Sequence, residues 1–186
     1  MANVGIFATA QQTTLVPDLL LSLDVRAPDD PFPKINRSYF VWQYGKPPDV
    51  VIEVVSNRKG GELANKLLDY ARMGVAFYVV YDPEGHISEQ PLRIFTRHGS
   101  SFTETTDPWL HDIGLGLTLW EGEYEDIRGV WLRWCNQDGT ILRTGQENAA
   151  QERIRAEQER ARAEQANERV AALAAKLRAL GIDPDA

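Results

Sequence analysis

The residues whose types and spacing could do chemistry lie in and around the segment from Asp49 to Val55. Side chains alternate between the two faces of an extended strand, so Glu53 shares a face with Val51 and Val55. Its neighbours in the segment are apolar, which makes Glu53 a carboxylate in a surface suited to burial. Because an unpaired buried carboxylate is costly, a metal ion or a basic side chain must lie close to it.

Lys66 is the candidate for that positive charge. It lies at the margin of the apolar stripe of a predicted helix, 62–73, which must pack this stripe on a sheet. In a metal-dependent hydrolase, such a lysine can orient water or stabilise developing charge. A plain ion pair with Glu53, or a lysine whose ammonium reaches water, explains the same spacing equally well.

Asp18 offers a second carboxylate, because Pro17 and Asp18 open another strand-like run, 19–23. A strand-start Asp can meet a Glu inside a neighbouring strand, and two carboxylates with water suit Mg²⁺. The simpler interpretation is that Asp18 only caps the strand start. Asp49 lies about 13 Å along the strand from Glu53, which is too far to share a small ion directly.

The elements that must position these residues predict an α/β (α+β) domain. A strand, a helix and a strand follow one another between residues 49 and 81, which is typical of a parallel pair joined by a right-handed crossover. Shorter flanking strands predict antiparallel edges, and hence a mixed sheet. The expected strands are 4–8, 15–25, 49–55, 77–81, 92–96 and 101–104. Residues 26–34 are expected to form a loop, and Gly74 to end the helix.

The last part of the chain predicts two further features. Residues 130–142, with Trp131, Trp134 and a turn at 137–139, predict a small appended hairpin. Residues 146–180 are almost all Ala, Glu, Gln, Arg and Leu, and the apolar residues of their final part recur at a/d spacing. The chain therefore divides into a domain at 1–145 and a helical coiled-coil tail at 146–181. A solvated single helix and a short dimeric coiled coil both explain the tail.

Composition limits the function. The net charge of −7 argues against a protein that holds nucleic acid by bulk electrostatics, although a local basic cleft remains compatible with it. The single cysteine, Cys135, allows no internal disulfide and fits a reducing, cytoplasmic setting. No segment has the length of apolar sequence that a membrane helix needs.

Several runs together resemble the Uma-two family, which is described as restriction endonucleases of the PD-(D/E)XK fold. The likeness spans most of residues 15–143, and the Ala/Glu/Arg-rich tail is also similar to that of many members. The runs that carry it are Val16-Pro17-Asp18, Pro48-Asp49-Val50-Val51-Ile52-Glu53-Val54-Val55-Ser56, Lys66-Leu67-Leu68-Asp69-Tyr70-Ala71-Arg72-Met73-Gly74-Val75, Tyr78-Val79-Val80-Tyr81-Asp82-Pro83, Gly114-Leu115-Gly116-Leu117-Thr118-Leu119-Trp120-Glu121-Gly122 and Trp131-Leu132-Arg133-Trp134-Cys135.

The resemblance implies a restriction-endonuclease-like mixed sheet flanked by helices, a Mg²⁺ or Mn²⁺ site, and hydrolysis of DNA phosphodiester bonds. Asp18 matches the first acidic position and Glu53 the second, so these two would bind the metal. The lysine expected two residues after the glutamate is replaced by Val55, and Lys66 matches a lysine donated from the following helix. The family carries more chain before Pro17, so the domain is predicted to be N-terminally short.

Two functions therefore compete. The first is a metal-dependent endonuclease in which Asp18, Glu53 and Lys66 are catalytic and DNA is the substrate. The second is a catalytically inactive protein of the same fold that acts as an interaction or regulatory module, with a homodimer formed through its tail. The acidic net charge, the short N-terminal region and the helical tail favour the second.

Overall fold

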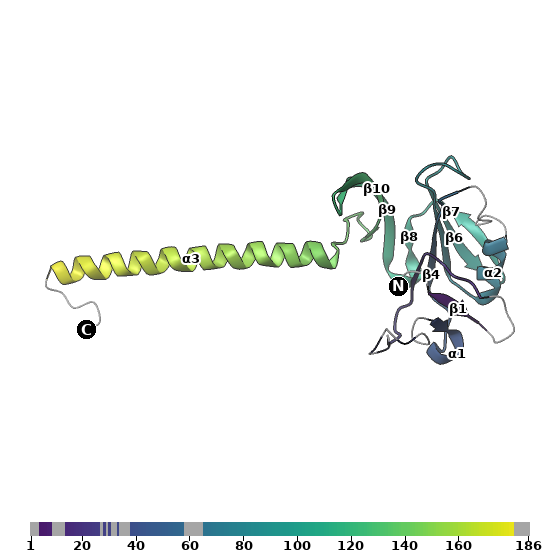
Figure 1. The fold of residues 1–186 in the computed structure, drawn as a ribbon, viewed down its shortest axis with the longest axis horizontal. Helices are drawn as coiled ribbons and strands as arrows, with labels where there is room; N and C mark the ends of the chain where they lie inside the picture. The colour runs from purple at the N-terminus through teal and green to yellow at the C-terminus, as the bar shows by residue number, and fades with distance from the viewer. Residues whose placement is uncertain are drawn as a thin grey trace. The chain divides into compact units, whose positions relative to one another are not determined.

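A computed structural model describes residues 4–8, 14–26, 28, 30, 33, 38–57 and 65–180. The chain divides into two compact units, Met1–Ile141 and Leu142–Ala186. The first contains the sheets and helix α2 (Asn65–Met73), and the second contains the long helix α3 (Gly145–Ala179) (Figure 1). This mixed α+β architecture, with a mixed sheet and a long C-terminal helix, confirms the predicted fold class and is consistent with a restriction-endonuclease-like fold.

The central sheet has five strands in the order β2-β4-β5-β6-β7. Their bounds are β2 (Leu19–Leu21), β4 (Val50–Val54), β5 (Phe77–Tyr81), β6 (Leu92–His98) and β7 (Ser101–Thr105). Strands β4 and β5 run parallel, whereas β2 lies antiparallel to β4 and β6 and β7 continue antiparallel beyond β5. The predicted parallel pair and the antiparallel edges are therefore confirmed.

Strand β4 is buried on both faces. Its β-branched residues favour the extended backbone, and their alternation divides them between two cores. Val51 and Val55 join the cluster that contains Tyr70 of α2, whereas Val50 and Ile52 join a second cluster on the opposite face. The predicted two-faced strand is thus confirmed, and Glu53 belongs to the face that carries Val51.

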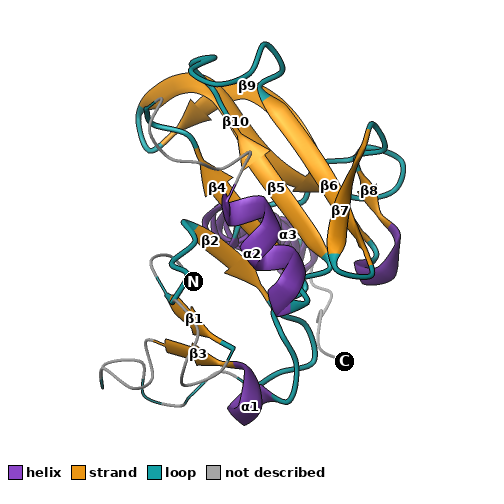
Figure 2. Cartoon of the chain, turned by 90° about the vertical axis from the view of Figure 1, so that its right-hand side faces the viewer, coloured by secondary structure: helices purple, strands orange, loops and turns teal. Residues whose placement is uncertain are grey.

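Helix α2 covers the first of these faces (Figure 2). Tyr70 and Ala71 are its buried residues. It ends at Gly74, whose φ of 95° lies in the region that only glycine enters without strain, as the sequence predicted. The predicted helix start at residue 62 lies outside the described residues.

The opposite face is covered by a three-stranded antiparallel sheet made of β8 (Trp109–Leu110), β9 (Leu115–Tyr124) and β10 (Ile127–Cys135). A short 3₁₀ helix, η2 (His111–Ile113), joins β8 to β9. Leu110, Leu117 and Trp134 contribute to the second core cluster.

The prediction of a separate hairpin at 130–142 is wrong. Residues 130–135 belong to β10, which pairs with β9 along its whole length. The connecting turn contains Glu125 and Asp126, whose φ angles of 50° and 63° are values that hairpin turns usually give to Gly or Asn. Because this sequence lacks the usual Asn-Gly signal, the turn was not recognisable. The turn at 137–139 only returns the chain to a single bridge between Cys135 and Ile141.

The N-terminal predictions are partly correct. Strand β1 (Gly5–Phe7) falls within the predicted segment 4–8, but it pairs with β3 (Ser38–Phe40) in a separate two-stranded parallel sheet. The predicted strand 15–25 is a strand only at Leu19–Leu21, with Leu15 forming an isolated bridge to Ile6. Strand β3 and the short helix α1 (Val41–Tyr44), which follows it, were not predicted.

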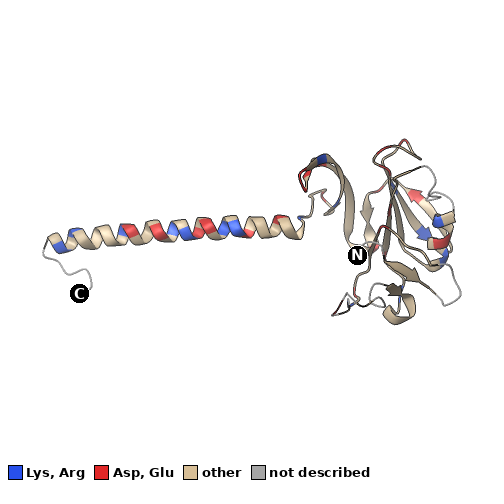
Figure 3. Ribbon diagram, in the orientation of Figure 1, with Lys and Arg blue, Asp and Glu red and all other residues tan. Residues whose placement is uncertain are grey.

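Helix α3 begins with a capping box. The Thr144 hydroxyl accepts the backbone N–H of Glu147, and the Glu147 carboxylate accepts the backbone N–H of Thr144, at 3.2 and 2.6 Å. None of the helix residues is buried. Acidic and basic side chains alternate along much of it (Figure 3), and the pairs Arg155–Glu159 and Arg160–Glu164 lie one turn apart. No helix in the described part of the chain is long and apolar enough to cross a membrane.

Candidate functional site

The pairing of β2 with β4 brings the two predicted carboxylates near each other. The paired residues end at Leu19 and Ile52; Asp18 directly precedes Leu19, and Glu53 directly follows Ile52. The two carboxylates are near enough for the charge of Asp18 to act on Glu53. Glu53 lies on the face of the sheet that packs under α2.

Glu53 is 2% exposed, and side chains of α2 bind both of its carboxylate oxygens. The Lys66 ammonium donates to Oε2 at 2.9 Å, and the Tyr70 hydroxyl donates to Oε1 at 2.7 Å. Lys66 and Tyr70 are one helical turn apart, so they project from the same side of α2. The structure therefore joins two of the three predicted site residues, Glu53 and Lys66, in a largely buried ion pair.

Burial raises the pKa of Glu53 above its ordinary value, and the negative charge of Asp18 adds to the rise. The hydrogen bonds from Tyr70 and Lys66, together with the charge of Lys66, act in the opposite direction. Burial also raises the pKa of Tyr70, helped by the adjacent Glu53, so its hydroxyl stays protonated and can only donate to the carboxylate. A second positive charge beside Glu53 would favour its ionised form further.

Asp18 occupies the edge of the same site. Its Oδ2 accepts the backbone N–H of Val54 at 2.7 Å, which ties the start of β2 to the end of β4. The residue is exposed, unlike Glu53. The capping interpretation of Asp18 is therefore satisfied by this bond, and the carboxylate still lies near enough to act electrostatically on Glu53.

Asp49 is held elsewhere. Lys46 donates to Asp49 Oδ1 and Oδ2 at 2.9 and 2.7 Å, and the backbone N–H of Leu23 donates to Oδ2 at 2.7 Å. The Lys46 ammonium also donates to the Leu23 carbonyl at 3.0 Å. Asp49 thus fastens the start of β4 to the chain that follows β2.

Tyr70 is the site residue that the sequence interpretation missed. Its place in the apolar stripe of the helix suggested a core residue only, and it is indeed fully buried, with its ring 5.2 Å from that of Tyr78. A signal was present, because Lys66 and Tyr70 have the spacing that puts two donors on one side of a helix. Whether the two donors contact Glu53 depends on how close packing brings that side of α2 to the strand, and residue spacing does not give this distance.

The donor chemistry of this site fits a hard divalent cation. Mg²⁺ is commonly held by one or two carboxylates with water and substrate phosphate completing its shell, and Asp18 and Glu53 are two carboxylates close enough to interact. Within the described residues, no cluster of three or more His, Cys, Asp or Glu side chains could hold a metal. Water or substrate oxygen atoms would therefore have to complete the shell of a cation bound by these two oxygen donors.

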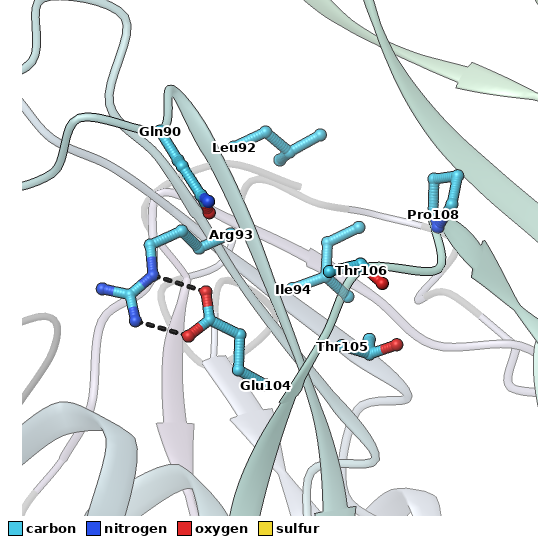
Figure 4. Close-up of a pocket in the computed structure, with 8 residues that line it drawn as sticks. All are labelled: Gln90, Leu92, Arg93, Ile94, Glu104, Thr105, Thr106 and Pro108. Atoms are coloured by element: carbon cyan, nitrogen blue, oxygen red, sulfur yellow. Dashed lines mark hydrogen bonds and ion pairs between the residues drawn. The ribbon is translucent and has the colours of Figure 1, made fainter.

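A pocket of about 210 Å³ lies elsewhere, lined by residues from the start of β6, the end of β7 and the adjoining loops. Arg93 and Glu104 cross it in a two-pronged ion pair of 2.7 and 2.6 Å (Figure 4). None of the predicted site residues lines it. Because its one basic side chain, Arg93, is already paired with Glu104, the lining carries no net charge to attract a charged ligand.

The family comparison covers most of the first unit. Residues 2–118 match the model of the Uma2 family, whose description is "Putative restriction endonuclease". This range contains both carboxylates, Lys66 and Tyr70. A search of curated proteins and a search of solved structures found no match. The family match spans more than half of the chain and agrees with its mixed sheet, and the chain belongs to the Uma2 family.

Proposed function

We propose that this protein is a Mg²⁺- or Mn²⁺-dependent endonuclease that hydrolyses phosphodiester bonds of DNA. Membership in a restriction endonuclease family suggests nuclease activity and DNA as the substrate. The observation that carries the proposal is the buried carboxylate of Glu53, paired with Lys66 and close enough to Asp18 for the charge of Asp18 to act on it. A reducing, cytoplasmic setting stays a prediction from the single cysteine.

In this proposal Asp18 and Glu53 hold the cation. When bound, it supplies electrostatic stabilisation of the phosphoryl oxygens and lowers the pKa of water. The Lys66 side chain is 30% exposed, and its ammonium contacts the buried carboxylate. Its ammonium can therefore orient the attacking water or stabilise charge that develops on the phosphate.

Plasmid nicking tests this function. Wild-type protein is expected to convert supercoiled DNA to the nicked form with Mg²⁺ or Mn²⁺ and not with EDTA, and Glu53→Gln is expected to abolish the conversion. Glu104→Gln is a matched control, because it removes the charge of another carboxylate that is paired with a basic side chain. Equal nicking by wild type and Glu53→Gln, or none by a well-folded wild type over a range of metals and DNA and RNA substrates, would contradict the proposal.

A second candidate function is an interaction module whose working part is α3, assembled as a homodimer. The specific observation is that Val170, Leu173 and Leu180 are 65%, 56% and 75% exposed, although they recur at coiled-coil spacing. Such a row in an otherwise polar helix is stabilised when a second helix covers it.

Sedimentation or light scattering tests the dimer. Leu173→Glu with Leu177→Glu is expected to convert a dimer to a monomer, because it places charges in the row. Ala171→Glu with Ala175→Glu adds the same charge on another side of the helix and is expected to leave the dimer intact. A monomeric wild type at every concentration would rule out this assembly.

A further inference from the structure

The two donors that hold Glu53 differ in how freely they can leave it. Lys66 is attached by a long side chain that is 30% exposed. Tyr70 is 0% exposed, and its ring packs against Tyr78 inside the core cluster that also contains Val51. Movement of Lys66 away from the carboxylate would therefore leave the packing of the core in place, whereas Tyr70 cannot move without disturbing the core.

The two donors also differ in charge. A divalent cation at Glu53 would repel the Lys66 ammonium and compete with it for Oε2. The Tyr70 hydroxyl is neutral and donates to the other oxygen, Oε1. A cation at Oε2 would therefore neither repel this hydroxyl nor compete with it for its acceptor. Its hydrogen bond is thus compatible with both the ion-paired and the cation-bound carboxylate.

We propose that Tyr70 is a positioning residue of the site: by holding Oε1 of Glu53, it keeps Oε2 directed towards the place where Lys66 and a divalent cation exchange. The inference rests on the proposed function, because it assigns Tyr70 a task towards the cation. Groups that hydrogen-bond a metal-binding carboxylate fix its orientation, and their removal typically weakens metal binding about 10–100-fold.

Calorimetric titration of the full chain with Mn²⁺ tests the proposal without any substrate. Tyr70→Phe keeps the buried ring and removes only the hydroxyl, and it is expected to weaken Mn²⁺ binding about 10–100-fold. Tyr39→Phe is the matched control, because Tyr39 is also a core tyrosine, 5% exposed, and its hydroxyl bonds to Ser22 and Lys46 instead. Near-UV circular dichroism checks that both variants are folded.

The outcomes separate this inference from the proposed function. Wild-type binding that is lost in Glu53→Ala, weakened in Tyr70→Phe and unchanged in Tyr39→Phe supports both. Binding that is lost in Glu53→Ala but equal in Tyr70→Phe and wild type overturns the role of Tyr70 alone. Absence of Mn²⁺ binding by folded wild type overturns the metal-dependent function, and the role of Tyr70 with it.

A measurement on the wild-type protein keeps the proposal testable if Tyr70→Phe does not fold. A buried hydroxyl proton in a short hydrogen bond exchanges slowly enough to be observed by proton NMR. The Tyr70 hydroxyl resonance is expected to persist and to shift when Mg²⁺ is added. Its disappearance at saturating Mg²⁺ would show that the cation breaks the bond, which would overturn the proposal.

Discussion

At the scale of single residues, Asp49 and Glu53 of one short segment have opposite surroundings. Lys46 and a backbone N–H bind Asp49 near the start of β4, while two side chains of α2 bind Glu53 near its end. Both carboxylates are paired with a lysine, so pairing alone does not distinguish a structural group from a site. Glu53 differs from Asp49 in its nearly complete burial and in the nearby second carboxylate, Asp18.

Asp49→Ala is accordingly expected to lower stability and to leave the site intact. Loss of its charge-assisted hydrogen bonds should cost about 1–3 kcal/mol, because the Leu23 N–H loses its acceptor and the Lys46 ammonium keeps only the Leu23 carbonyl. Urea denaturation measures this change, and Mn²⁺ titration of the folded variant should match wild type. Weakened Mn²⁺ binding in a folded Asp49→Ala protein would place Asp49 in the site after all.

Asp82 predicts a pH dependence of stability. Although its burial acts to raise the pKa, backbone N–H groups of Ile87, His86 and Ser88 donate to the carboxylate and lower the pKa below its ordinary value of 3.8. A lowered pKa in the folded state means that the ionised group stabilises the fold above the ordinary value, and that this stabilisation is lost as the pH falls through the lowered one.

Asp82→Asn is therefore expected to destabilise the protein by about 1–3 kcal/mol at neutral pH. The difference from wild type should shrink as the pH falls below 3.8. Denaturation over a series of pH values measures it, with Asp112→Asn as an exposed control of equal charge change. A difference that stays constant down to the acid limit would contradict the assignment.

At the scale of elements, strand β4 and helix α2 carry the site, and α3 depends on local interactions. Helix α3 has no buried residue, so its first turn relies on the capping box of Thr144 and Glu147. Thr144→Ala is expected to destabilise that turn by about 1 kcal/mol. Hydrogen exchange should quicken at residues 145–148 and stay unchanged in β4. Unchanged exchange at the helix start would show that another contact fixes it.

Sequence patterns predicted the elements with strong periodicity and missed those that depend on partners. Strands β4 and β5 follow from β-branched runs, and the stop of α2 follows from Gly74. The β9–β10 pairing was missed because Glu125 and Asp126 form its turn without glycine. Strand β3 was missed because it is short and exists by pairing with β1.

The candidate site was predictable to the same extent. Strand and helix periods indicated a pair of Glu53 and Lys66, but they equally allowed a lysine whose ammonium reaches water. Tyr70 could not be assigned from periodicity, because a stripe residue that packs and a stripe residue that also donates to a carboxylate have the same spacing. That distinction depends on the distance between α2 and the sheet, which packing determines.

At the scale of the whole molecule, the buried core residues among those that the structure describes all lie in the first unit. A chain ending at Ile141 is therefore expected to unfold at nearly the same temperature as the full chain, as measured by calorimetry, because α3 buries no residue. Nuclease activity that does not depend on the dimer should persist in the shortened chain. A markedly lower unfolding temperature would show that the tail stabilises the first unit.

The two-faced burial of β4 also limits how this chain can change over evolutionary time. A single-residue insertion or deletion inside the strand would move every following side chain to the opposite face. Glu53 would then enter the apolar cluster of Val50 and Ile52, out of reach of Lys66 and Tyr70, and the core would be lost together with the site. Substitutions can inactivate such a site gradually, whereas a change in the length of the strand abolishes the fold in a single step. Descendants of this chain should therefore vary in the residues of this strand but keep its length.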